Sequence, residues 1–70
     1  MPYMSEDDLP LSVRRHLPPH AQHIFRLAFN HAFDQYGGDE VRAFRVAWAA
    51  VRRVYEKVDG EWVARDRGAV

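Results

Sequence analysis

The stretch LPPHAQHIFRLAFN, from Leu17 to Asn30, carries the signals that decide the fold. Because a proline biases the residue before it away from the helical conformation, Pro18 predicts the end of a preceding segment. Pro19 can open a new helix at its first position, where no intrahelical bond needs its missing N–H. The apolar residues that follow recur at helical spacing, so the stretch predicts an amphipathic helix that begins at Pro19.

Further breakers divide the rest of the chain into elements. We expect the helix that begins at Pro19 to run to Tyr36 and to stop at Gly37-Gly38, because glycine accepts the left-handed cap conformation. A short helix is predicted from about Pro10 to Leu17, and a third helix from Asp39 to about Lys57. The sequence thus predicts a mainly α, three-helix domain over residues 1–70, with two longer antiparallel amphipathic helices closed by the short one.

The same periodicity predicts which side chains form the core. Seventy residues are close to the smallest size at which one core holds a fold, and nine aromatic residues compensate because each buries a large area. A row of aromatic residues can also line a cofactor-binding site, but their spacing along one face of a helix favours a role in core packing. The predicted core residues are Phe25, Phe29, Phe33, Tyr36, Phe44, Trp48, Val51, Tyr55 and Trp62.

A small sheet is expected to join the two ends of the chain. Asp59-Gly60 is a turn signal, and the segment EWVAR after it shows some alternation of apolar and polar residues. The short apolar segment at Tyr3-Met4 needs a partner to be stable. We predict that it pairs with Trp62-Val63 as a two-stranded sheet.

The polar side of the second helix carries residues with more than one interpretation. His20 and His23 are three residues apart and can reach one metal ion, whereas His31 lies too far along the axis. A zinc site normally takes three or four protein ligands, so this pair is only a weak metal candidate, and solvated or capping histidines are favoured. Asn30 either faces water or bonds a neighbouring segment, and we favour the bond.

Composition excludes several classes of protein. Without cysteine the chain has no disulfide and no thiolate zinc site. Ten basic and ten acidic residues cancel, which argues against steering of the whole molecule toward nucleic acid or anionic membrane. The longest apolar run, Val46 to Val51, is far shorter than the roughly 20 residues of a membrane span. The opening MPYMSEDD does not resemble a signal peptide, so we expect a soluble, cytoplasmic protein.

No catalytic arrangement is predicted. Ser12 has histidines nearby in the sequence but no evident orienting carboxylate or oxyanion hole. Gly37-Gly38 is a bare pair followed by acids and not a phosphate-binding loop. We therefore expect neither an enzyme nor a cofactor.

One polar feature is more specific than the others. Arg42, Arg45, Arg52 and Arg53, here called the arginine flank, lie along one side of the third helix beside the edge of Trp48. Such a stripe can grip phosphates or an acidic protein surface. The alternative is an ordinary solvated face. Zero net charge and the lack of a spare aromatic platform for bases favour that alternative.

Taken together, LPPHAQHIFRLAFNHAFDQY, RVAWAAVRRVYEK and GEWV resemble the ChaB family of bacterial proteins, which are described as regulators of cation transport. Two features depart from the family pattern. The connection after Tyr36 is shorter than in other members, and Phe44 stands where a polar residue is usual. The matching positions, in register from the first residues onward, are Leu9-Pro10, Leu17-Pro18, His20-Ala21-Gln22, Ala28-Phe29-Asn30, Tyr36, Val46 to Val51, Tyr55 and Trp62.

The resemblance implies a binding module and not a catalyst. The family name implies a regulatory contact with a sodium, calcium or potassium–proton antiporter, and so a protein partner without membrane insertion. A nucleic-acid-associated accessory domain that uses the arginine flank is the second hypothesis. A metal-sensing module built on His20 and His23 is the third.

Overall fold

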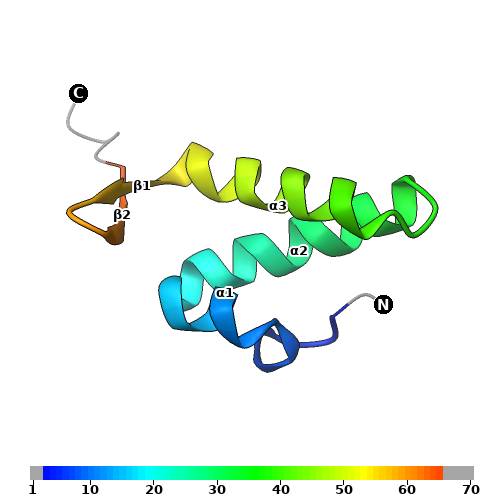
Figure 1. Cartoon of the computed structure of the whole chain (residues 1–70), viewed down its shortest axis with the longest axis horizontal. Helices are drawn as coiled ribbons and strands as arrows, with labels where there is room; N and C mark the ends of the chain where they lie inside the picture. Colours follow the sequence, from blue (N-terminus) through cyan, green and yellow to red (C-terminus); the bar gives the residue numbers. More distant parts are fainter. Residues whose placement is uncertain (1–2, 66–70) are drawn as a thin grey trace.

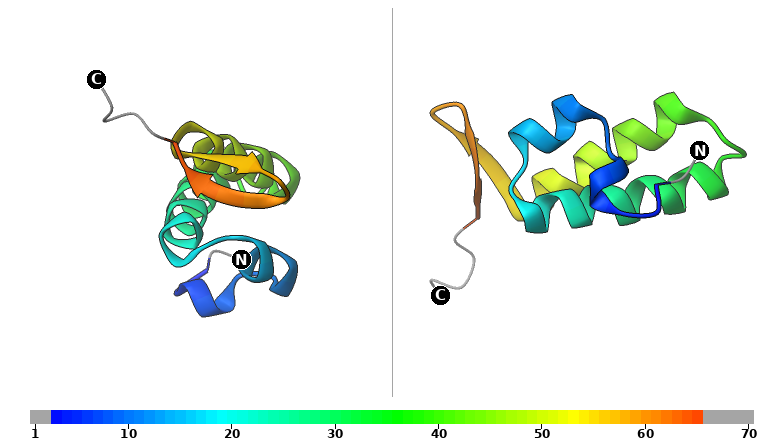
Figure 2. Two further views of the ribbon diagram at one scale, coloured as in Figure 1. Left: turned by 90° about the vertical axis from the view of Figure 1, so that its left-hand side faces the viewer. Right: turned by 90° about the horizontal axis from the view of Figure 1, so that it is seen from below.

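The computed structural model describes residues 3–65, and Figure 1 shows two long helices lying side by side in opposite directions. A short helix packs against the beginning of the second helix, and a hairpin follows the third. Figure 2 shows that this hairpin crosses the end of the helical pair, near the end of the short helix. The elements are the 3-10 turn η1 (Glu6–Asp8), α1 (Leu11–His16), α2 (Pro19–Gln35), α3 (Glu40–Val54), β1 (Tyr55–Val58) and β2 (Glu61–Ala64).

The connection between α2 and α3 follows from its glycines and its aspartate. Gly37 and Gly38 have φ of 66° and 89°, and the N–H of Gly38 donates to the carbonyl of Phe33 at 2.8 Å. This bond satisfies one of the carbonyls that a helix end leaves without a partner. The Asp39 side chain then caps α3 by accepting from the N–H of Arg42 at 3.1 Å. The predicted stop at the two glycines is confirmed.

The core lies mainly between α2 and α3. Alanines on both helices are fully buried, and their small side chains let the two backbones approach closely. Phenylalanine rings fill the space beside them. Residues of the N-terminal segment and α1 cover the other side of α2. The buried residues are Leu9, Val13, Leu17, Ala21, Phe25, Phe29, Ala32, Ala43, Ala47, Val51 and Tyr55.

Tyr36 does not belong to the core as predicted. It occupies the cap position just beyond α2, where its side chain is 40% exposed and the guanidinium of Arg42 lies 4.8 Å from its ring centroid. The helical pattern that placed it in the core ends one residue earlier. Four other predicted core residues pack against the buried cluster but are only half-buried, namely Phe33, Phe44, Trp48 and Trp62.

The two-stranded sheet is present, but its strands are not the predicted ones. β1 and β2 form an antiparallel hairpin in which Lys57 faces Trp62. Asp59 and Gly60 have φ of 50° and 83°, which matches the two-residue turn that hairpins favour. Closing so short a loop loses little entropy compared with joining the two ends of the chain. Because residues 55–58 pair with β2 in this hairpin, α3 ends at Val54 and does not continue to Lys57 as predicted.

The N-terminal segment is held by a side chain and not by a strand. The Tyr3 N–H donates to Oδ1 of Asn30 at 2.8 Å, and Nδ2 of Asn30 donates to the Tyr3 carbonyl at 2.7 Å. The Asn30 amide thus makes hydrogen bonds to both the N–H and the carbonyl of Tyr3, as a neighbouring β-strand would. The Tyr3 ring also packs against Phe29, with centroids 4.9 Å apart. The prediction that Asn30 bonds a neighbouring segment is confirmed, whereas the pairing of Tyr3-Met4 with Trp62-Val63 is wrong.

A second polar contact fastens η1 to α2. The carboxylate of Glu6 accepts a hydrogen bond from Nε of Arg26 and another from Nδ1 of His23 at 3.2 Å. The bond from Arg26 is the main reason that the pKa of Glu6 lies below its ordinary value. Partial burial opposes this effect, and the bond from His23 adds to it.

This contact predicts a pH-dependent stability. A carboxyl whose pKa is lowered by folding contributes stability that is present above its ordinary pKa and is lost as the pH falls through the lowered value. Glu6→Gln should therefore lower the melting temperature at pH 7 and have little effect in acid, where the wild-type carboxyl is protonated. Thermal melts between pH 7 and pH 2 measure this. Asp7→Asn, which removes an exposed carboxylate one residue away, is the control; equal pH profiles for Glu6→Gln and wild type would contradict the prediction.

Candidate interaction surface

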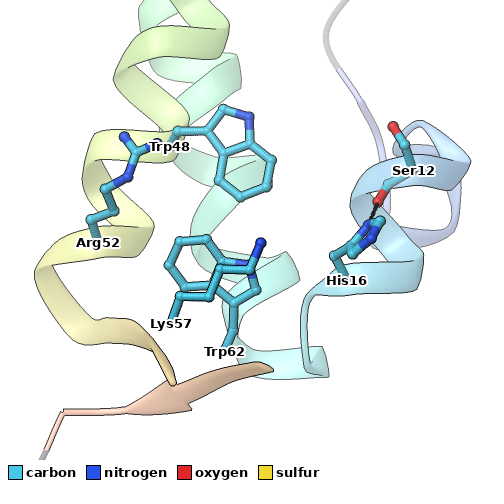
Figure 3. A pocket seen from close by; sticks show the side chains of 6 residues that line it. All are labelled: Ser12, His16, Trp48, Arg52, Lys57 and Trp62. Carbon is cyan, nitrogen blue, oxygen red and sulfur yellow. Dashed lines mark hydrogen bonds between the residues drawn. The ribbon is translucent and has the colours of Figure 1, made fainter. Parts of the chain in front are cut away.

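A groove lies between α1, α3 and the hairpin, and each of these elements contributes two side chains to it (Figure 3). On α1 and α3 the two residues are four apart, which places them on one helical face. On the hairpin they are directly opposed partners of the two strands. The hollow has a volume of about 340 Å³. We call it the tryptophan groove, and its lining residues are Ser12, His16, Trp48, Arg52, Lys57 and Trp62.

Two stacked indole rings dominate the groove. The ring centroids of Trp48 and Trp62 are 5.8 Å apart, with 27° between their planes. Trp48 also meets Phe25 edge-on at 5.1 Å, which anchors it to the core. Both tryptophans keep part of their surface exposed. Both tryptophans were predicted as core residues, and the groove was not predicted. The turn signal at Asp59-Gly60 could have indicated it, because a hairpin with this turn brings Lys57 opposite Trp62.

Basic side chains surround the indoles. Nζ of Lys57 lies 5.7 Å from the centroid of the Trp62 ring, in the range of a cation–π contact. Figure 3 shows Arg52 next to Trp48, and His16 facing the tryptophans from α1. Among the residues that the structure describes, no acid lines this groove. The groove therefore offers apolar surface and positive charge together.

A second hollow of about 370 Å³ adjoins the first, because His16 and Trp62 line both. It lies between the end of α1 and the hairpin turn. Arg15 and Glu61 give it charges of opposite sign. His16 and Trp62 thus border both hollows, which lie next to each other at α1 and the hairpin.

The arginine flank is exposed along α3, but its members do not gather at one point. Arg42 and Arg52 are ten residues apart, which is about 15 Å along a helix. The Arg42 guanidinium lies against Tyr36, as described above. Arg52 reaches the tryptophan groove, and its carbonyl accepts a hydrogen bond from Nε of Arg65 at 2.7 Å. Of the four arginines, Arg52 alone lines the groove.

The histidines go to different partners. Nδ1 of His20 is hydrogen-bonded to the Tyr55 hydroxyl at 3.1 Å, whereas His23 donates to Glu6. Within residues 3–65, no group of three or more histidine, cysteine or acidic residues could hold a metal ion. Nδ1 of His16 donates to the backbone carbonyl of Ser12 at 2.6 Å and so does not activate the serine hydroxyl through this nitrogen.

No helix in the described part of the chain combines the length and apolar character that crossing a bilayer requires. The fold and the groove define a small helical domain with a C-terminal hairpin and a basic, tryptophan-lined surface.

The sequence profile of the ChaB family matches residues 9–65, and the chain belongs to this family. Proteins named "Putative cation transport regulator ChaB" from Escherichia coli (strain K12) and Shigella flexneri are each 47% identical to it over 70 residues. Each alignment covers 87% of this chain and 92% of the relative. The solution NMR structure titled for the "putative cation transport regulator ChaB" has a TM-score of 0.82 at 43% identity, covering 93% of this chain and 100% of that one. The resemblance and the mainly α fold are confirmed.

Proposed function

We propose that this protein is a regulator of cation transport that acts by binding a protein partner and not by catalysis. The observation that carries the proposal is the 47% identity to relatives that are named as cation transport regulators. The partner we propose is a sodium, calcium or potassium–proton antiporter, contacted from the cytoplasmic side without insertion of this chain into the membrane.

The proposed contact surface is the arginine flank. Arginine forms bidentate bonds with carboxylates and is enriched at protein interfaces, so an exposed row of four favours an acidic partner surface. Charge across an interface mainly accelerates association. Arg45→Glu together with Arg52→Glu should therefore slow association with the partner.

Antiport by inside-out membrane vesicles that contain the antiporter tests this proposal. Adding the purified protein is expected to change the initial rate of cation–proton exchange, and the Arg45→Glu/Arg52→Glu variant should need a higher concentration for the same change. The control is His31→Glu, which adds a negative charge at an exposed position on α2. An exchange rate that does not respond to saturating protein would contradict the proposal.

The second candidate function is a nucleic-acid-associated accessory domain. It is favoured by one observation, the stacked Trp48 and Trp62 beside Arg52, because single-stranded nucleic acid binds on aromatic rings flanked by cations. Zero net charge argues against it, and we expect only non-specific binding with Kd on the order of 10⁻⁴ M or weaker at physiological salt. Titration of single- and double-stranded oligonucleotides at two salt concentrations measures this. Micromolar binding that Arg45→Glu/Arg52→Glu abolishes would reverse the order of the two functions.

A further inference from the structure

We infer that the tryptophan groove is a peptide-docking site, which takes a short acidic segment of the partner with one large apolar side chain among its carboxylates. This inference rests on the proposed function, because it names the site and the chemistry through which the protein partner is bound. It differs from that proposal in placing recognition in the groove and not along the whole arginine flank.

The apolar part of the ligand follows from the indoles. Trp48 and Trp62 are both only half-buried, and their rings stack at the same opening. Tryptophan and arginine are enriched among the residues that carry binding energy at interfaces, and here Arg52 lines the same groove as both rings. A hollow of about 340 Å³ accommodates one large side chain with its neighbouring backbone.

The acidic part follows from the charge of the lining. Arg52 and Lys57 lie beside the indoles, His16 lines the groove from α1, and no acid lines the groove within the described residues. Arginine and lysine form stronger, charge-assisted hydrogen bonds with carboxylates than with neutral acceptors. Nζ of Lys57 lies 5.7 Å from the centroid of the Trp62 ring, so a carboxylate that binds this ammonium lies close to the indole.

The groove walls are fixed in advance, which favours binding of a flexible segment. Nε2 of Gln22 donates to the carbonyls of Leu17 at 2.8 Å and Arg14 at 3.2 Å, and so ties the end of α1 to α2. At the opposite wall, the hydrogen bond between His20 and Tyr55 ties the start of the hairpin to α2. A surface that needs little reorganisation loses less entropy on binding.

Two neighbouring hollows favour a peptide over a compact small molecule. The second hollow shares His16 and Trp62 with the groove and is also lined by Glu61. An extended segment can place its carboxylates near Arg52 and its next residues in the second hollow, where Glu61 disfavours an acid. Two adjoining hollows suit several residues of extended chain.

The test is an NMR titration of the full, isotope-labelled protein with the acetylated peptide Glu-Asp-Phe-Glu-Asp. Two matched peptides separate the contributions: Gln-Asn-Phe-Gln-Asn lacks the charge, and Glu-Asp-Ser-Glu-Asp lacks the apolar side chain. We expect saturable shifts of the Trp48 and Trp62 indole N–H signals with the first peptide only. Arg52→Gln should weaken its affinity about tenfold, as for the loss of a charge-assisted pair, whereas Arg42→Gln at the far end of the flank should not change it.

Because Arg52 is exposed, its variant should stay folded, and its unchanged spectrum away from the groove verifies this. Shifts that are equal with all three peptides, that map away from the groove, or that are absent would overturn the inference. Tighter binding of an oligothymidine at the same two indoles would overturn it in favour of nucleic acid. The outcome is separable from the vesicle assay: antiport that responds without peptide binding refutes the groove alone, and peptide binding without an effect on antiport refutes only the proposed function.

Discussion

Phe25→Ala is expected to unfold the domain. Phe25 is 0% exposed and its ring contacts Phe29, Phe44 and Trp48 at centroid distances of 6.4, 5.8 and 5.1 Å. Removing a buried phenylalanine ring destabilises a protein by about 3–5 kcal/mol. Native domains are stable by about 0.05–0.15 kcal/mol per residue, and the lower end of this range gives about 3.5 kcal/mol for 70 residues, which the loss of the ring cancels. The variant should therefore lose most of its folded population at room temperature.

Circular dichroism with urea titration measures this effect. Phe33→Ala is the matched control, because Phe33 lies at the end of the same row of rings and is only half-buried. It should shift the midpoint less than Phe25→Ala does. A Phe25→Ala variant with a native spectrum and an unchanged midpoint would show that the core is not organised around this ring.

Asn30→Ala is expected to release the N-terminal segment from α2 and to destabilise the fold by about 1–3 kcal/mol, because it removes two part-buried hydrogen bonds that contribute about 0.5–1.5 kcal/mol each. Both hydrogen bonds of the Asn30 amide go to the backbone of Tyr3, so one substitution removes both. The Tyr3 ring should then lose its fixed position against Phe29. Leu9, further along the same segment, should retain its burial through α1.

Amide hydrogen exchange combined with thermal melting tests this expectation. The Tyr3 N–H should exchange much faster in Asn30→Ala than in wild type, whereas His31→Ala, at the exposed neighbouring position, should leave it unchanged. Asn30→Asp keeps an acceptor for the Tyr3 N–H but turns a carboxylate toward the Tyr3 carbonyl, so its effect should be intermediate or worse. Unchanged protection of Tyr3 in Asn30→Ala would contradict the assigned role.

Much of the helical fold was predictable because its boundaries are set by local chemistry. Pro19 and the two glycines act through their own backbone preferences, which hold wherever the chain folds. The end of α3 was not predictable in this way. Tyr55 continues the apolar spacing of the helix, and only the turn at Asp59-Gly60, with the strand pairing it permits, draws Tyr55 into β1.

The contacts that build the surface were harder to predict than the helices. The partner of Asn30 lies 27 residues away, and periodicity does not identify such a partner. For Trp48 the helical pattern predicted the correct face of α3 but not how far the ring is buried. The exposure of this ring depends on the positions of Trp62 and α1 in the folded domain. The arginine flank was visible in the sequence, but the link of Arg52 to a groove required the folded hairpin.

The most direct test of the account is site-specific photo-crosslinking in native cells, with a photoreactive amino acid in place of Ser12. Ser12 lines the tryptophan groove and carries none of the proposed binding energy. A probe at His31, exposed on α2, is the control. We expect a crosslink from position 12, but not from position 31, to a membrane cation–proton antiporter, at an acidic segment that contains a large apolar residue. Crosslinks from position 12 to nucleic acid, or equal crosslinks from both positions, would contradict it.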